Sequence, residues 1–152
     1  MRAARRVAHL VRRWRTSLDR SPLVPTDVDF VRRVLSPSEW ELWSRMDIAD
    51  RRHSLLVARR FGELVSGAID AELAAALLHD VGKSVSSLST SERVVATLVA
   101  PFARPRRFDA YYRHEEIGLE LCRSAGSCDR TLSLLADPGH PLAEALRRAD
   151  DL

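Results

Sequence analysis

The sequence predicts a single all-α domain of 152 residues, and three observations support that fold class. No segment alternates apolar and polar residues cleanly, as a half-buried strand would. Apolar residues recur instead at three- and four-residue intervals, which places them on one face of a helix. Short groups of serine, aspartate, proline and glycine separate these segments, and such residues begin and end helices. A chain of this length can bury a hydrophobic core without disulfides or a structural metal.

The composition excludes several classes of protein. Hydrophobic residues make up 45% of the chain and charged residues 30%, which is ordinary for a globular protein and unlike a disordered or fibrous one. No apolar run approaches the roughly 20 residues that span a bilayer, and no signal-peptide core follows the basic start. We therefore expect a cytoplasmic protein with no transmembrane segment. Cys122 and Cys128 are six residues apart, which fits neither a CxxC redox pair nor half a zinc ribbon, so we expect reduced, structural thiols.

Residues 1–20 form the first predicted unit, a basic amphipathic helix packed on the domain. Asp19 is their one acidic residue, and the arginines are Arg2, Arg5, Arg6, Arg12, Arg13, Arg15 and Arg20. Apolar residues recur at helical spacing on the other face: Val7, Leu10, Val11, Trp14 and Leu18. We expect the apolar face to pack on the domain and the arginines to be solvated. The alternative is contact of the arginines with nucleic-acid phosphates or an anionic membrane.

Residues 21–47 form the second unit, an extended connector followed by short helices. Thr26 is expected to begin a helix that ends at Val34. The next helix has a stronger start signal, because Ser36-Pro37-Ser38-Glu39 combines a capping serine, a proline at the first helical position and the glutamate of a capping box. We expect this helix to cover Trp40–Met46.

Residues 48–152 form the third unit and contain the longest predicted helix, Ile48–Ser66, which a glycine ends. Asp70 is expected to cap the following helix, Ala71–His79. That segment is apolar almost all round, so it should lie at the centre of the domain. Gly82 is expected to end it.

Helical segments continue to the end of the chain. A capping box of Ser89 and Glu92 predicts a helix over Val94–Val99, and a polar, arginine-rich loop follows it. His114 lies near the start of the next helix, which ends near Gly126.

The last two helices are short. Asp129 is expected to cap a helix over Arg130–Leu135, and residues 136–141 form a proline- and glycine-containing turn. The final helix, Leu142–Leu152, carries Asp150 in its last turn.

The most informative segment is Leu77-Leu78-His79-Asp80-Val81-Gly82-Lys83, which places an imidazole and a carboxylate side by side at the end of the apolar helix. Both groups are metal ligands. Lys83 is the one lysine among the 24 Lys and Arg residues. A compact ammonium beside a metal site suits a phosphate oxygen. The alternative is that Lys83 only follows the helix, whose dipole favours a cation at its carboxyl end.

Further candidate ligands are dispersed along the chain. Four histidines lie on or beside the predicted helices, 26, 35 and 26 residues apart: His53, His79, His114 and His140. Local zinc motifs place their ligands much closer together. The ligands would therefore come from separate helices, as in metal sites inside helical bundles. A mixed imidazole and carboxylate shell suits iron, manganese, zinc or cobalt better than calcium.

In this order, the residues resemble the signature H…HD…D of the HD-domain superfamily of metal-dependent phosphohydrolases. The segment of residues 77–83 resembles the family's LLHDIGK, and His114-Glu115-Glu116-Ile117-Gly118 resembles its HPEIG. Arg147-Arg148-Ala149-Asp150-Asp151 resembles its closing ADD helix. The likeness covers about Ile48 to Leu152.

The resemblance implies a helical HD/PDEase-like bundle, here with an extra basic N-terminal helix, in which four side chains hold one divalent metal: His53, His79, Asp80 and Asp150. Members with two metals add two histidines, and His114 matches the first of them. The second usually belongs to an HH pair that this sequence lacks. His140 or Asp137 could replace it, or the site could hold a single metal.

The resemblance also implies an activity, the hydrolysis of a phosphoester or phosphoanhydride (EC class 3.1 or 3.6). Asp80 would bridge metals or orient the attacking water, and Lys83 would neutralise charge on the phosphate. Arg52 and Arg113, each next to a candidate histidine in sequence, could add phosphate contacts. The HDxxED pattern of alarmone hydrolases and the GYP segment of cyclic di-GMP phosphodiesterases are absent from the sequence. We therefore expect a small phosphorylated substrate, such as a nucleotide or dinucleotide.

Two other functions stay open at this point. The missing HH pair would suit a non-catalytic HD module that binds a partner, although the presence of the other ligand types argues against it. Alternatively, the metal could be purely structural, in which case its removal would unfold the domain.

Overall fold

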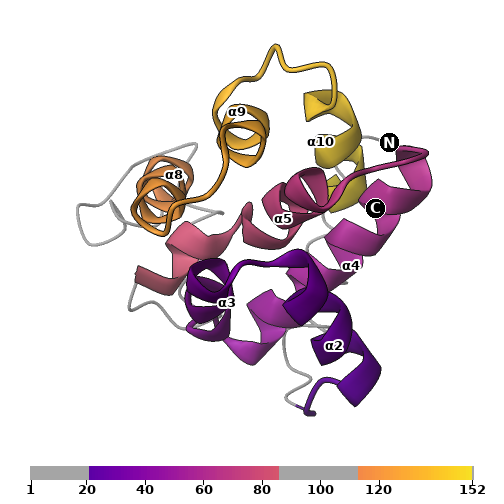
Figure 1. Ribbon diagram of the computed structural model, residues 1–152, viewed down its shortest axis with the longest axis vertical. Helices are drawn as coiled ribbons and strands as arrows, with labels where there is room; N and C mark the ends of the chain where they lie inside the picture. Colours follow the sequence, from indigo (N-terminus) through magenta and orange to yellow (C-terminus); the bar gives the residue numbers. More distant parts are fainter. Residues whose placement is uncertain (1–20, 86–112, 152) are drawn as a thin grey trace, which may run out of the picture.

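The computed structural model describes residues 21–85 and 113–151, and every regular element in those two stretches is helical (Figure 1). The predicted all-α fold is thus confirmed for this part of the chain. In chain order, the elements are α2 (Pro25–Val34), α3 (Pro37–Ser44), α4 (Ile48–Leu64), α5 (Asp70–Leu78), the 3-10 helix η1 (Val81–Val85), α8 (His114–Ser124), α9 (Asp129–Ala136) and α10 (Ala143–Asp151). The predicted basic helix over residues 1–20, and the capping box, helix and arginine-rich loop predicted within residues 89–107, lie outside the described residues. None of the helices in the described stretches is long and apolar enough to cross a membrane.

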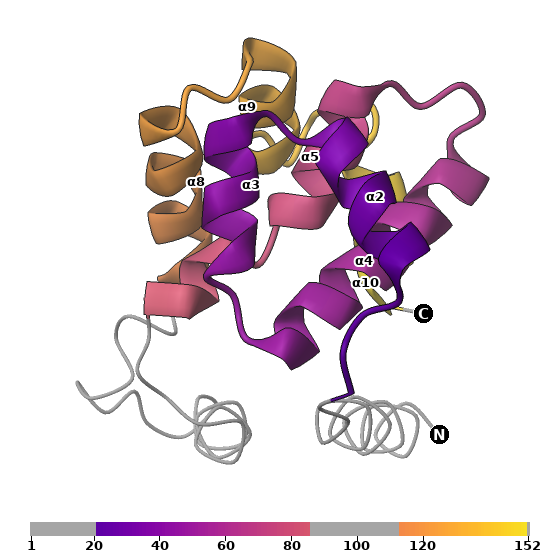
Figure 2. The ribbon, with the colours of Figure 1, turned by 60° about the horizontal axis from the view of Figure 1, so that its bottom comes forward.

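Helix α5 lies at the centre of the domain, as its nearly continuous apolar sequence predicts. It packs against α4 and α9 and also contacts α2 and α3 (Figures 1 and 2). Ala75, Ala76 and Leu77 on this helix are fully buried. Small alanine side chains allow neighbouring helices to approach closely. The end of α5, where the His79-Asp80 pair follows, is therefore held from several sides.

Trp43 on α3 connects the first helices to α4. Its side chain is fully buried, and its indole Nε1 donates a hydrogen bond to Oγ of Ser54 on α4 (2.9 Å). Ser54 is fully buried as well. The contact buries a large apolar ring while satisfying its polar N–H group.

The helix starts confirm one predicted cap and correct three. At α3 the predicted capping box is present: Glu39 N–H donates to Oγ of Ser36 (3.3 Å), and Ser36 N–H donates to the Glu39 carboxylate (2.9 Å). Helix α2 begins at Pro25, one residue earlier than predicted. Asp70 and Asp129 are the first residues of α5 and α9 rather than their caps. A carboxylate anywhere in the first turn is stabilised by the helix dipole, so the sequence signal does not separate these two positions.

The helix ends agree with two of three predicted glycine stops. Gly67 follows α4 with φ of +77°, and Gly126 follows α8 with φ of +76°, a left-handed conformation that favours glycine. The prediction that Gly82 ends the central helix was wrong. Helix α5 ends at Leu78, and Gly82 lies within η1, where a different constraint requires glycine.

Candidate metal centre

Five of the candidate side chains converge from four helical segments. His53 lies on α4, His79 and Asp80 directly follow α5, His114 is the first residue of α8, and Asp150 lies on α10. Helix α10 packs on α4, and α8 packs on η1. The fold thus brings together residues up to 97 positions apart in sequence.

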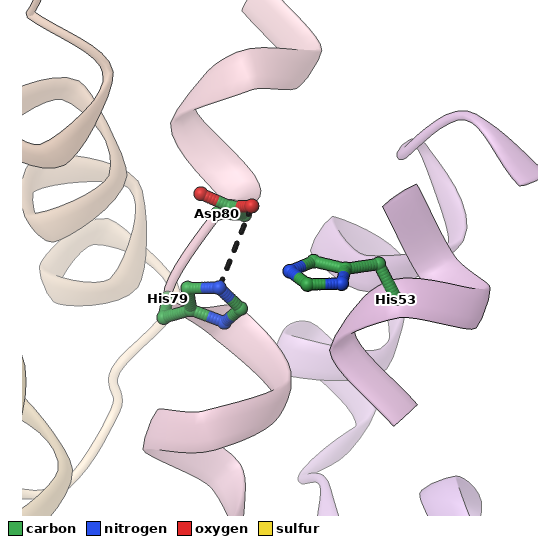
Figure 3. Close-up of side chains that lie close together, drawn as sticks. All are labelled: His53, His79 and Asp80. Atoms are coloured by element: carbon green, nitrogen blue, oxygen red, sulfur yellow. Dashed lines mark ion pairs between the residues drawn. The ribbon is translucent and has the colours of Figure 1, made fainter. Parts of the chain in front are cut away.

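The tightest group contains two imidazoles and two carboxylates. One ligand atom each from His53, His79 and Asp80 lies within 4.8 Å of the others (Figure 3). Oδ1 of Asp150 lies 2.7 Å from Nε2 of His53 and 3.6 Å from Nε2 of His79. Ligand atoms bound at about 2.0–2.2 Å from one first-row metal ion lie roughly 3–4 Å from one another. The spacing of these side chains therefore suits a small divalent metal.

The backbone orients the imidazole of His79. Its Nδ1 donates to the carbonyl oxygen of Ala76, one turn earlier (2.9 Å). Nε2 consequently faces the carboxylates, at 3.4 Å from Oδ2 of Asp80. This Nε2 atom is buried and makes no hydrogen bond of good geometry among the described residues, although the carboxylates of Asp80 and Asp150 lie within ion-pair distance. Such an atom is rare in a folded protein, and coordination by a metal would satisfy it. The residues present thus fit a divalent ion.

The carboxylates of the group favour a positive charge at Nε2 of His79. Burial alone would lower the pKa of His79, but the carboxylates of Asp80 and Asp150 outweigh burial and raise it to about 10. Burial alone would raise the pKa of Asp80, but the positive charges of His79 and Lys83 hold it well below its usual range. Either a proton on Nε2 of His79 or a metal ion can supply this positive charge. A metal ion bound there would therefore compete with the proton for the same nitrogen atom.

The two oxygens of Asp80 face different partners. Oδ2 faces His79 and forms a buried ion pair with the Lys83 ammonium. Oδ1 lies 3.7 Å from Nε2 of His114. His114 therefore lies next to the tight group, on the side of the Asp80 carboxylate opposite His79. An aspartate oriented in this way can hold two neighbouring cations, one at each oxygen.

Two glycines allow η1 and α8 to touch, and the sequence alone did not reveal their role. A Cβ atom on Gly82 would lie 1.8 Å from the carbonyl oxygen of His114. A Cβ atom on Gly118 would lie 3.2 Å from the backbone nitrogen of Gly82. Glycine is required at position 82 because the two backbones approach closely, which replaces the helix-ending role predicted above. A signal was present in the sequence, since each glycine belongs to one of the two segments that resemble family motifs.

The two candidate arginines contact residues near them in the fold. Arg113 Nε pairs with the Glu116 carboxylate at 2.9 Å, with both side chains exposed. Arg52 donates to the carbonyl oxygen of Ser21. To contact a phosphate, each side chain would have to add to or exchange these contacts.

His140 and Asp137 lie in the predicted turn before α10. Nδ1 of His140 accepts the backbone N–H of Leu142 (3.1 Å), and Oδ1 of Asp137 accepts the backbone N–H of Gly139 (2.8 Å). In a neutral imidazole whose Nδ1 accepts, Nε2 carries the proton. His140 would therefore have to leave this bond or change its tautomer to bind a metal, and neither residue belongs to the tight group.

Separate helices direct two histidines and two aspartates toward one point, and His53, His79 and Asp80 among them form a group that could hold a metal ion. A family model described as the HD domain matches residues 51–152, about two thirds of the chain. The chain therefore belongs to the HD domain family, whose members are generally metal-dependent hydrolases, and the resemblance inferred from H…HD…D is confirmed. No curated protein and no solved structure matches the chain.

Proposed function

We propose that this HD domain hydrolyses a phosphoester or phosphoanhydride with the help of a divalent transition metal. The observation that carries the proposal is the buried Nε2 of His79, which makes no hydrogen bond of good geometry among the described residues and faces two carboxylates. His53, His79, Asp80 and Asp150 would hold one ion, and Asp80 with His114 would hold a second. Iron, manganese, zinc or cobalt bound there would activate water and polarise the phosphoryl group.

The residues around the ligands have separate tasks in this proposal. The carbonyl of Ala76 holds the proton of His79 on Nδ1, which leaves Nε2 available as a ligand. The positive charges of His79 and Lys83 keep Asp80 ionised, and the ion pair with Lys83 fixes its orientation. Because Lys83 is buried beside this carboxylate, its charge is poorly screened by water and would also offset negative charge developing on a nearby phosphate.

For the substrate, we propose a small phosphorylated molecule, a nucleotide or dinucleotide. The two residues that follow Val81-Gly82 are Lys83 and Ser84, so the acidic pair of the HDxxED pattern is missing. The GYP segment is missing as well. Alarmones and cyclic di-GMP are therefore disfavoured as substrates.

The metal content of purified protein tests the proposal directly. After reconstitution with manganese, iron, zinc or cobalt, we expect up to two ions per chain by mass spectrometry. Asp150→Ala should lose metal, whereas Asp151→Ala, which changes the exposed neighbour on the same helix, should not. Bound metal would then justify a screen of phosphodiesters, nucleotides and dinucleoside polyphosphates. Wild-type protein that holds no metal after reconstitution would contradict the hydrolase and favour a binding module.

The same measurement tests His140 as a further ligand. An unchanged metal content in His140→Ala would leave this residue in its bond with Leu142 and outside the centre. Loss of one ion would show that the ring leaves that bond to coordinate metal.

A further inference from the structure

We propose that Gly82 and Gly118 are positioning residues that set the distance between His114 and Asp80, and thereby form the second metal position. This inference rests on the proposed function, because it assigns the two glycines to the second ion.

The contact at Gly82 involves the first turn of α8. A Cβ atom at this position would lie 1.8 Å from the carbonyl oxygen of His114 and 2.7 Å from the backbone nitrogen of Gly118. In an α-helix, the carbonyl of residue 114 accepts the N–H of residue 118. The added carbon would therefore enter the hydrogen bond that closes the first turn of α8, the turn from which the His114 side chain extends.

The same contact also fixes the position of Asp80. Gly82 follows Asp80 by two residues, and the intervening backbone is closed by a hydrogen bond from Lys83 N–H to the Asp80 carbonyl (3.0 Å). A displacement between η1 and α8 therefore changes the separation between His114 and Asp80.

The separation leaves little room to widen. Nε2 of His114 lies 3.7 Å from Oδ1 of Asp80, and two ligand atoms of one ion lie roughly 3–4 Å apart. A Cβ atom on Gly118 would meet Gly82 N at 3.2 Å and Val81 Cγ1 at 3.5 Å. Since protein interiors have few voids, η1 would have to retreat by about a few tenths of an ångström. That displacement is comparable to the amount by which the 3.7 Å distance from His114 Nε2 to Asp80 Oδ1 can grow before the two atoms are too far apart to share one ion.

Gly62 offers a control. It also lies inside an α-helix, α4, but a Cβ atom there would meet Leu73 Cδ2 at an ordinary van der Waals distance of 3.7 Å. Gly62→Ala and Gly118→Ala therefore gain the same intrinsic helix propensity. They differ in that Gly62 is exposed, whereas Gly118 is buried and its new methyl group would push on η1.

The test is a titration of metal-free protein with Co²⁺, with the bound ions counted by mass spectrometry. We expect about two ions for wild type and Gly62→Ala. Gly118→Ala should keep the first ion and either lose the second or bind it at least about tenfold more weakly, as changes around metal ligands typically do. Gly82→Ala should act in the same direction and more strongly. Circular dichroism and thermal melting of the metal-free variants establish that they are folded.

A double-mutant comparison separates positioning from a general packing effect. If Gly118 acts through His114, His114→Ala and His114→Ala/Gly118→Ala should bind Co²⁺ identically. The inference is overturned if Gly118→Ala keeps both ions while His114→Ala loses one. It is also overturned if wild type binds one ion that His114→Ala does not affect. Neither result contradicts the proposed function, which depends instead on the first ion and is tested by Asp150→Ala.

Discussion

Replacing Asp80 by asparagine should destabilise the metal-free protein, because the change removes the carboxylate from its buried ion pair with Lys83. The side chains of Asp80 and Lys83 are only 5% and 10% exposed, so water cannot solvate the remaining ammonium. Removing one partner of a buried ion pair costs about 3–5 kcal/mol. In a domain of this size, each kcal/mol lowers the Tm by about 2–4 °C. We therefore expect Asp80→Asn to melt about 6–20 °C below wild type.

The assay is thermal and urea unfolding followed by circular dichroism at pH 7 with a chelator. Asp80→Asn/Lys83→Met removes both charges and should recover most of the loss, because a neutral pair of similar volume needs no solvation. If Asp80→Asn melts within 2 °C of wild type, about the shift expected for 1 kcal/mol or less, the buried ion pair does not stabilise the fold as proposed. A double variant no more stable than Asp80→Asn would show that the loss does not come from the Lys83 ammonium.

The pH dependence of this difference has a defined sign. The folded-state pKa of Asp80 lies well below its ordinary value of 3.8. Its stabilising effect is therefore fully present above about pH 3.8 and is lost as the pH falls from there through the depressed pKa. The Tm difference between wild type and Asp80→Asn should shrink on acidification below pH 3.8 and should not grow.

Three further results are expected. Cys128 is exposed and its pKa is lowered, mainly by the side-chain hydrogen bond with Thr131, whereas burial raises the pKa of Cys122 to about 11. A thiol reagent at pH 7.5 should therefore label Cys128 rapidly and Cys122 slowly in the native protein. Labelling of both cysteines at equal rates would contradict this expectation. Ser54→Ala leaves the buried indole N–H of Trp43 without its acceptor, so the free energy of unfolding measured in urea should fall by about 1–3 kcal/mol. An unchanged free energy of unfolding would show that the bond is dispensable. Because the carboxylates raise the pKa of His79 to about 10, Co²⁺ binding below that pH should release a proton, and the apparent affinity for Co²⁺ should rise with pH. Calorimetry in buffers of different ionisation enthalpy measures the proton release. If no proton is released, Nε2 of His79 is not a ligand.

The candidate ligand group could be identified from sequence because each member carries its own local signal. His79 and Asp80 follow an apolar helix, Asp150 lies in the closing helix, and His53 lies on a helix that the pattern of apolar residues identifies. The family order H…HD…D then predicts that these side chains lie close together, and the structure agrees. The proposed role of these residues as ligands stays a prediction until metal is measured.

Other features could not be predicted because they arise only when two segments meet. Gly82 looks like a helix stop in sequence, and its contact with the backbone of His114 exists only once α8 packs on η1. Likewise, the turn around His140 could be predicted, but the bond from Leu142 N–H to its ring nitrogen could not. Asp70 shows a smaller error of the same kind, since only backbone torsions separate a cap from the first helical residue.

The structure also bears on whether the metal is needed for folding. The core around α5 is continuous and apolar, and Trp43, Phe61 and Leu77 within it are fully buried without contributing to the ligand group. In the metal-free protein, the raised pKa of His79 keeps a proton at the position where an ion would bind, which balances the nearby carboxylates. Both observations oppose a purely structural metal. A chelator should therefore leave the helical circular dichroism signal intact while removing the ion, whereas unfolding on chelation would show that the metal, and not the core, holds these helices together.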